Sequence, residues 1–283
     1  MLLNSTEIDS ILFSDCPYED LTTEGLGIGE ARGRITAKLK AEGVAAGLEI
    51  AAALFERAGA RAELLAREGD VLPAGTPVMI IEGRAKALHA AYKMAQCVME
   101  YAGGIAGRTR MMVEAARAER PEVQVAGTRK HWPGGKRIAL AGLLAGGGIV
   151  HRLGLSDSIL VFDQHRVFAS DFDAAFRALR LRSPERKIAV EAGDPAEAMH
   201  FLELGADIVQ CERFAPEVFE AFAREARAAA PGAVLTVAGG VNAENAAAYA
   251  RAGADILITS WPYWARPADV KMAFESLEGG NGD

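Results

Sequence analysis

Hydrophobic and polar positions follow two different patterns along the chain, and the change falls near Pro121. From residue 35 to 83, short apolar runs are broken by turn signals such as REGD and LPAGTP. Residues 71–83 (VLPAGTPVMIIEG) predict two antiparallel strands joined by a short loop. Residues 48–60 have the spacing of an amphipathic helix that Gly59 closes, and residues 85–116 predict one or two long helices leading out of a first domain.

After Pro121 the pattern becomes strand, loop and helix, repeated. Six apolar runs predict strands, at residues 123–128, 158–162, 187–192, 207–212, 233–239 and 255–260, and alanine-rich amphipathic segments separate the later ones. Such alternation indicates βα units and a parallel sheet. With about six units, a complete or slightly incomplete (β/α) barrel is favoured over an open doubly wound sheet.

Composition and charge narrow the functional class. A length of 283 residues suggests two domains, or one barrel with an appendage, and a hydrophobic content of 50% excludes global disorder. The net charge of −7 argues against a general nucleic-acid binder but allows a local basic pocket for a phosphorylated ligand.

The three cysteines are scattered and form no CxxC pair, which argues against a disulfide framework or a structural zinc site. Glu7 and Asp9 precede any apolar run that could form a signal peptide, and the longest uncharged apolar stretch, residues 138–150, is too short to span a bilayer. We therefore expect a soluble cytoplasmic protein that binds neither membranes nor nucleic acid.

Polar groups cluster where the predicted strands end, which is the edge of a (β/α) barrel that carries its chemistry. Glu191 and Glu212 lie one βα unit apart, so we expect them at similar height on neighbouring strands, facing one cavity. The alternative, that one of them caps the next helix, is weaker because Asp194-Pro195 and Ala215-Pro216 are better helix starts. In VAGGVNAEN, Gly239-Gly240 lies between a strand and a helix predicted to begin near Asn242 or Ala243, a pattern suited to binding phosphate.

A second cluster is basic. TRKHWPGGKR (128–137) and AGGGIVHR (145–152) carry Arg129, Lys130, Lys136, His151 and Arg152 around glycine-rich loops. A basic run is often only a solvated face, but here it begins directly at a strand end, which favours a pocket for an anion. The chain contains no GxGxxG, Walker, HExxH or GxSxG motif, so nicotinamide, nucleotide triphosphate, zincin and serine-hydrolase chemistry are disfavoured.

These residues resemble the quinolinate phosphoribosyltransferases. The shared motifs occur in that family's order and spacing across nearly the whole chain: EDLTTEGLG (19–27), GVAAGLE (43–49), GGIAGRT (103–109), TRKxxPG (128–134), GGGxxHRxGLSD (146–157), LxxDxH (160–165), VE (190–191) and GG (239–240). Residues 130–134 and 151–168 look closest to a branch of the family encoded with molybdate-transport genes.

The resemblance implies an N-terminal α/β sandwich at residues 1–112 and an open α/β barrel at 113–267, with the tail, 268–283, packed on the first domain. It implies a homodimer in which the N-terminal domain of one subunit covers the barrel mouth of the other. The implied reaction transfers ribose 5-phosphate from phosphoribosyl pyrophosphate to a ring nitrogen, with Mg²⁺ present, without an organic cofactor and with release of pyrophosphate.

Site residues also follow from the resemblance. It implies that the reacting groups meet Lys130, Glu191 and Glu212, and that Glu191 and Glu212 hold Mg²⁺, directly or through water. It places the acceptor at Lys93, Arg129, His151, Arg152 and Phe162, with Lys93 reaching across the dimer interface. It places the 5′-phosphate at Ala238, Gly239, Gly240, Ser260 and Trp261.

The chain departs from the family pattern at the barrel's end, at Thr236, Ala238 and the loop 260–265, and also in the acceptor pocket. Phe162 and Leu140 replace two lysines, and Lys93 replaces an arginine, so partners for the two carboxylates of quinolinate are lost. Each such charge-assisted partner is worth about 1.5–3 kcal/mol. We therefore expect a less anionic acceptor, with the part of the site that binds ribosyl phosphate retained.

Three functional hypotheses remain open at this stage. The first is a phosphoribosyltransferase with an unidentified acceptor, linked to molybdenum metabolism. The second is a true quinolinate phosphoribosyltransferase of NAD synthesis with a rebuilt pocket. The third is a non-catalytic binding protein of the molybdate system, against which the presence of Lys130, Glu191 and Glu212 argues.

Overall fold

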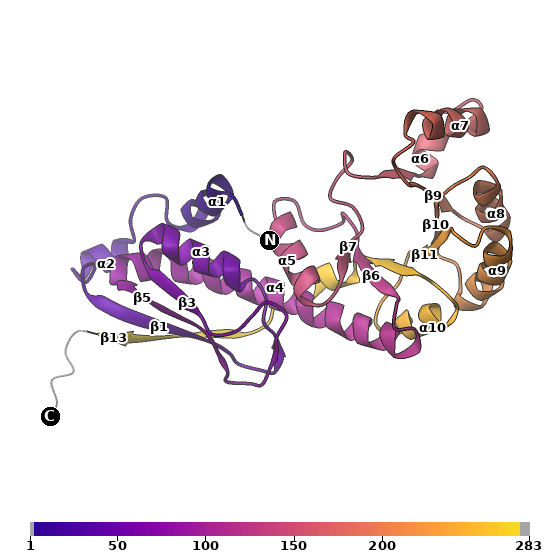
Figure 1. Cartoon of the computed structure of the whole chain (residues 1–283). Coiled ribbons are helices and arrows are strands. Elements are labelled where there is room, and N and C mark those ends of the chain that lie inside the picture. The colour runs from indigo at the N-terminus through magenta and orange to yellow at the C-terminus, as the bar shows by residue number, and fades with distance from the viewer. Residues whose placement is uncertain (1–2, 278–283) are drawn as a thin grey trace. The chain divides into compact units, whose positions relative to one another are not determined.

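Two groups of strands organise the chain, and the computed structural model describes residues 3–277 of it (Figure 1). The first unit contains residues 3–110, 132–147 and 263–277, and the second contains residues 111–131 and 148–262. Residues 132–147, predicted as part of the barrel domain, thus belong to the first unit. Within residues 3–277, no helix combines the length and apolar character needed to cross a membrane.

The first unit is an antiparallel sheet covered by helices. Its four strands have the order β13 (Val270–Ser276), β1 (Arg32–Leu39), β5 (Pro77–Arg84) and β3 (Arg61–Leu64). The core lies between the sheet and two helices, α3 (Leu48–Ala58) and α4 (Ala85–Glu119), of which α4 continues into the second unit. Gly59, at φ 96°, ends α3 in the left-handed conformation that glycine adopts most easily. This unit is the expected α/β sandwich.

The hairpin predicted for residues 71–83 is wrong. β4 (Val71–Leu72) pairs with β2 (Gly43–Val44) in a separate two-stranded sheet, not with β5. The reason is that both edges of β5 are already occupied, by β1 on one side and β3 on the other. The remaining helices of this unit are α1 (Ser5–Asp15), α2 (Leu21–Gly25) and α5 (Lys136–Ala145).

The tail forms a strand that the sequence reading did not single out. β13 pairs antiparallel with β1 over seven residues, from Val270 opposite Leu39 to Ser276 opposite Gly33. Val270 is 1% exposed and belongs to the same core as α3 and α4. The described part of the tail therefore completes the sheet of the first unit, while residues 278–283 lie outside the described residues.

The second unit is a seven-stranded parallel sheet in the order β7-β6-β12-β11-β10-β9-β8. The strands are β6 (Gln124–Gly127), β7 (Ile149–Val150), β8 (Ile159–Val161), β9 (Ile188–Ala192), β10 (Ile208–Glu212), β11 (Val234–Ala238) and β12 (Ile256–Thr259). β7 and β8 are not paired with each other, so the sheet is a barrel left open between them. Six of these strands lie within the predicted runs, and β7 is a strand that the glycine-rich pattern concealed.

Helices cover the outer face of this sheet. They are α6 (Asp163–Arg166), α7 (Phe172–Arg182), α8 (Pro195–Glu203), α9 (Pro216–Ala229) and α10 (Ala246–Arg251), followed after β12 by the 3₁₀ turn η1 (Trp261–Trp264). Alternate residues of the strands, such as Val190, Val209 and Val237, are almost fully buried against these helices. Since successive side chains of a strand point to opposite faces, the residues between them form the inner face.

Candidate active site

The strand register places the two predicted carboxylates on the inner face of the second unit. Glu191 of β9 lies opposite Gln210 of β10, and Glu212 follows Gln210 by two residues on the same face. Both glutamates are half-buried and lie at the carboxyl ends of their strands. The sheet therefore brings Glu191 and Glu212 to one edge, where parallel βα folds carry their sites.

The surroundings of Glu191 act on the ionisation of its carboxyl in opposite directions. The pKa of its carboxyl is raised, first by burial and then by the charge of Glu212, with Asp163 adding to the effect. A hydrogen bond from Gln210 Nε2 to Glu191 Oε2, 2.7 Å long, and the charge of Lys130 act in the opposite direction. Such opposing influences on one carboxyl are typical of functional sites.

Lys130 extends from the loop after β6. Its backbone N–H donates to Thr128 Oγ1 (3.1 Å), and Thr128 N–H donates to Thr259 O of β12 (2.9 Å), so the turn is closed on itself and joined to the sheet at Thr128. The Lys130 side chain is exposed, and its charge influences the carboxyl of Glu191. The sheet thus places Glu191 and Glu212 at one edge, and Lys130 follows a strand of the same sheet close enough for its charge to act on Glu191.

Glu212 is held close to the glycine turn of the next strand. A Cβ atom on Gly239 would lie 2.5 Å from Arg213 Cγ and 2.6 Å from Glu212 Oε1, so a larger residue here would have to displace both side chains. Arg213 has φ 60°, its N–H donates to Ala238 O (2.8 Å), and its Nε lies 3.5 Å from Glu212 Oε1. The turn after β10 and the turn after β11 thus fix one another around Glu212.

The predicted phosphate segment begins with two glycines in the left-handed region, Gly239 at φ 84° and Gly240 at φ 85°. Gly240 is exposed, and a Cβ on it would meet no atom within 4 Å, so the space beside its backbone is open, while its carbonyl accepts from Asn245 Nδ2 (3.1 Å). The helix start predicted near Asn242 is wrong, because α10 begins only at Ala246. Asn242 and Asn245 instead fold a turn, in which Asn245 Oδ1 accepts from Asn242 N–H (2.9 Å).

The other residues predicted for phosphate lie nearby on the sheet. Ala238 is opposite Glu212 and belongs to a small apolar cluster on the inner face with Ala126 and Ile258. Ser260 is half-buried at the end of β12. The N–H of Trp261 donates to Thr259 Oγ1 (3.0 Å), so this amide is already used within the chain, and the Trp261 side chain packs on the core.

The predicted acceptor cations gather beside β7. Arg152 is only 6% exposed, and the neighbouring charge of Arg129 adds to burial in lowering the pKa of its guanidinium. Burial, with the charge of Arg152, also lowers the pKa of His151 to about 4, so this imidazole is neutral at pH 7. Within residues 3–277, no carboxylate lies within salt-bridge distance of Arg152. A buried cation without an anion is costly, so the geometry favours an anionic ligand here.

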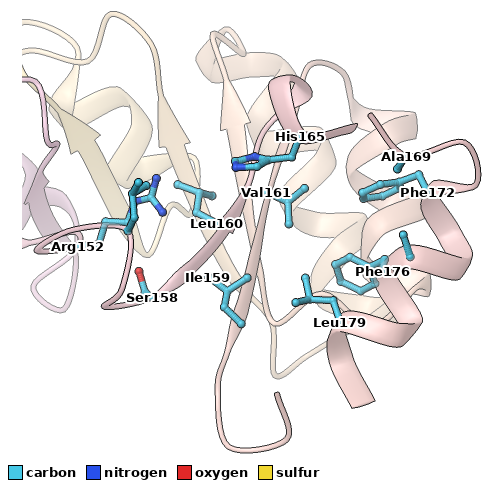
Figure 2. Close-up of a pocket in the computed structure, with 12 residues that line it drawn as sticks. Arg152, Ser158, Ile159, Leu160, Val161, His165, Ala169, Phe172, Phe176 and Leu179 are labelled. Atoms are coloured by element: carbon cyan, nitrogen blue, oxygen red, sulfur yellow. The ribbon is translucent and has the colours of Figure 1, made fainter. Parts of the chain in front are cut away.

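Aromatic rings border these cations. The guanidinium of Arg152 lies 5.5 Å from the ring centroid of Phe162. The imidazole of His165 stacks on the same Phe162 ring, with 5.8 Å between the ring centroids and 14° between the ring planes. Arg152 and His165 also line a pocket of about 470 Å³ whose remaining lining is mostly apolar. Figure 2 shows the side chains of Phe172, Phe176 and Leu179 on α7 turned toward β8, with Arg152 and His165 at the border.

Lys93 lies in the first unit, apart in the chain from these residues. Its side chain is exposed on α4, where Nζ donates to Gln96 Oε1 (3.0 Å) and lies 5.1 Å from the ring centroid of Tyr92. Its predicted reach into a partner's site stays a prediction, as does the homodimer.

Two polar residues of the site, Gln210 and Arg166, were missed in the sequence. Gln210 is 4% exposed and donates to Glu191. Arg166 forms ion pairs with Glu197 and with Asp163, the aspartate of the LxxDxH motif, which begins α6. Glu197 in turn accepts from Gly193 N–H (2.7 Å), which follows β9. The position of Gln210, two residues before Glu212 and therefore on its face, was the available signal.

The donor set fits a magnesium ion that arrives with a phosphorylated substrate. Within residues 3–277, no cluster of three or more His, Cys, Asp or Glu side chains is arranged to hold a metal ion by itself. Mg²⁺ is commonly bound by one or two carboxylates together with substrate phosphates and water. Glu191 and Glu212 offer such a pair of carboxylates.

Two family models match most of the chain. The model described as quinolinate phosphoribosyl transferase, N-terminal domain, matches residues 20–102, and that described as quinolinate phosphoribosyl transferase, C-terminal domain, matches residues 105–273.

Among curated proteins, the pyrophosphorylase ModD of Pasteurella multocida is 35% identical over 97% of this chain and 99% of its own length. Human nicotinate-nucleotide pyrophosphorylase [carboxylating] is 30% identical over 92% of this chain and 88% of its own. Among solved structures, NadC from Streptococcus pyogenes superposes with a TM-score of 0.88 at 23% identity, covering 98% of this chain and 100% of that one. This last likeness concerns the fold.

Proposed function

The chain belongs to the quinolinate phosphoribosyl transferase family, and from this we propose that it transfers ribose 5-phosphate from phosphoribosyl pyrophosphate to a ring nitrogen of a small heterocycle. The observation that carries the proposal is the convergence of Lys130, Glu191 and Glu212 at the carboxyl edge of one parallel sheet. One cation and two carboxylates at a common edge suit a reaction that separates a sugar cation from a polyanion.

The transfer breaks the bond between C1′ of the ribose and the pyrophosphate oxygen, and pyrophosphate leaves with the electron pair. The ring nitrogen supplies the pair that forms the new C1′–N bond. Positive charge develops on the sugar ring as the old bond lengthens, and Glu191 and Glu212 stabilise it and accept hydrogen bonds from the ribose hydroxyls. Lys130 offsets the negative charge that collects on pyrophosphate.

Magnesium enters this proposal as the ion that accompanies phosphoribosyl pyrophosphate. Glu191 and Glu212 would hold it, directly or through water, and the ion would neutralise phosphate charge. The open backbone at Gly240, together with Gly239 and Ser260, supports a place for the 5′-phosphate, since exposed amides of glycine turns bind anions.

The acceptor carries an anionic group and an otherwise weakly charged ring. Arg152 and Arg129 support binding of one carboxylate, and the neutral His151 supplies a hydrogen bond rather than a charge. Phe162 and the apolar pocket beside Arg152 favour an uncharged remainder. Such an acceptor differs from quinolinate, which is a dicarboxylate. The chain is also similar to the pyrophosphorylase ModD. The link to molybdenum metabolism rests on that likeness alone and belongs to the proposal.

A second candidate is quinolinate itself as acceptor. The cluster of Arg129, His151 and Arg152 favours it, because the charge of Arg129 lowers the pKa of Arg152 and two neighbouring guanidinium groups suit two carboxylates. Human nicotinate-nucleotide pyrophosphorylase, at 30% identity, also favours it. Formation of nicotinate mononucleotide and carbon dioxide from quinolinate would distinguish this candidate from the first.

The test measures pyrophosphate release from phosphoribosyl pyrophosphate and Mg²⁺ with quinolinate and with a panel of pyridine and pyrimidine monocarboxylates. We expect release with at least one monocarboxylate at higher kcat/KM than with quinolinate. Lys130→Ala should lower kcat/KM by about 100-fold or more, since it removes a charged contact to the leaving group. Lys187→Ala, an exposed lysine before β9, is the matched control and should retain full activity. Absence of phosphoribosyl pyrophosphate binding by the unaltered protein would refute the proposal.

A further inference from the structure

Gln210 is a buried amide with an unused hydrogen-bonding atom at the centre of the site. Its side chain is 4% exposed, and Nε2 donates to Glu191 Oε2 at 2.7 Å. Its Oε1 is buried and has no hydrogen-bond partner within residues 3–277. Buried polar atoms in folded proteins are nearly always paired, so an exception at this position calls for an explanation.

The strand neighbours of Gln210 do not satisfy it. The register sets Gln210 between Glu191 on β9 and Thr236 on β11. The hydroxyl of Thr236 donates to Val209 O (3.3 Å), so it is used by the backbone of β10. The amide is therefore held by one bond only, and that bond joins it to a carboxylate of the predicted reacting centre.

An apolar side chain of the same length would fill this space without an unpaired atom. Methionine has nearly the volume of glutamine and no donor or acceptor to satisfy. Folding alone thus gives no reason for an amide at position 210, since the unpaired oxygen costs free energy that a thioether would not. The hydrogen bond to Glu191 is what the amide adds.

We infer that Gln210 is a positioning residue for Glu191, whose carboxylate it orients toward the ribose hydroxyls of phosphoribosyl pyrophosphate. This inference rests on the proposed function. The amide fixes one oxygen of Glu191, and the other oxygen is left for the ligand. A carboxylate held in one orientation loses less conformational freedom on binding, which increases affinity. Gln210 acts through Glu191 and does not itself meet the substrate.

The experiment is a double-mutant cycle on the affinity for phosphoribosyl pyrophosphate in Mg²⁺, measured by isothermal titration calorimetry. Gln210→Met should weaken binding by about 10-fold, the effect of losing a hydrogen bond to a charged group. In a Glu191→Ala background the same change should have no further effect, since the carboxylate that it orients is gone. Unfolding midpoints of Gln210→Met and Gln210→Leu should equal or exceed that of the unaltered protein.

The matched control lies on the same strand. Cys211→Ala changes a fully buried side chain on the opposite face of β10, so it should lower the unfolding midpoint without changing the affinity of the folded protein. A merely structural role for Gln210 would give this same pattern. A loss of affinity equal in both backgrounds, no loss at all, or lower midpoints for both apolar variants would overturn the inference. If the unaltered protein does not bind phosphoribosyl pyrophosphate, the proposed function fails and this inference with it.

Discussion

Replacing Arg152 by methionine should stabilise the protein and at the same time weaken its binding of an anionic acceptor. Arg152 is 6% exposed, its near neighbours are the cation Arg129 and the neutral His151, and no described carboxylate balances its charge. Methionine keeps the apolar stem and removes the charge. Without ligand, the folded protein is then no longer destabilised by a buried guanidinium that has no anionic partner.

The magnitude follows from two opposing contributions. An uncompensated buried charge costs about 3–5 kcal/mol, and the contact with the Phe162 ring at 5.5 Å returns about 0.5–2 kcal/mol of it. The net gain for Arg152→Met is therefore about 1–4.5 kcal/mol in the free energy of unfolding. A unit of this size gains about 2–4 °C in unfolding midpoint per kcal/mol. Losing hydrogen bonds from a charged donor, at about 1.5–3 kcal/mol each, should weaken carboxylate binding at least about 10-fold.

Both quantities are measured on the same samples, by differential scanning calorimetry without ligand and by titration with quinolinate as the anionic probe. Arg182→Met on α7 is the control, because Arg182 is exposed and its replacement should change neither quantity. A lower midpoint for Arg152→Met, or unchanged quinolinate affinity, would refute the role of Arg152 as a cation that awaits an anion.

Three further predictions concern the same site. Gly239→Ala should weaken binding of phosphoribosyl pyrophosphate, because its Cβ would displace the side chains of Arg213 and Glu212. Gly240→Ala has nearly the same φ but open space around its Cβ, so it should lose a similar stability, about 1 kcal/mol, yet bind the substrate more tightly than Gly239→Ala; equal affinities would contradict this. Phe162→Lys should increase kcat/KM for quinolinate about 10-fold by restoring a cation in the acceptor pocket; no gain with quinolinate would count against Phe162 as an acceptor contact. The pKa of His151 is about 4 in the folded protein against an ordinary 6.5, so the unfolded chain binds the proton more readily. As the pH is lowered from 6.5 to 4, the free energy of unfolding should therefore fall by about 1.4 kcal/mol per pH unit. Plots of this free energy against pH that run parallel for the unaltered protein and His151→Gln would contradict this.

Much of the second unit could be predicted because its signals are local. Apolar runs bounded by turn residues gave six of its seven strands, and the spacing of Glu191 and Glu212 by one βα unit gave their common edge. The period of two in a strand then sets which side chains share a face. The inner face of β9 and β10 was thus implicit in the sequence.

Other features depend on pairing between distant segments, which local patterns do not encode. β4 pairs with β2 because β5 has no free edge, and β7, only two residues long, is a strand because β6 lies beside it. The late start of α10 depends on the side chain of Asn245 accepting from the backbone of Asn242. The burial of Arg152 and the unpaired atom of Gln210 appear only once neighbouring strands are in register.

The most direct test is a crystal structure of the protein with phosphoribosyl pyrophosphate and Mg²⁺. We expect the ribose hydroxyls at Glu191 and Glu212, pyrophosphate at Lys130 and the 5′-phosphate at the Gly239-Gly240 turn. A substrate bound away from these side chains, or Lys130 directed away from the carboxylates when the substrate is bound, would contradict a single ribosyl-transfer site in this unit.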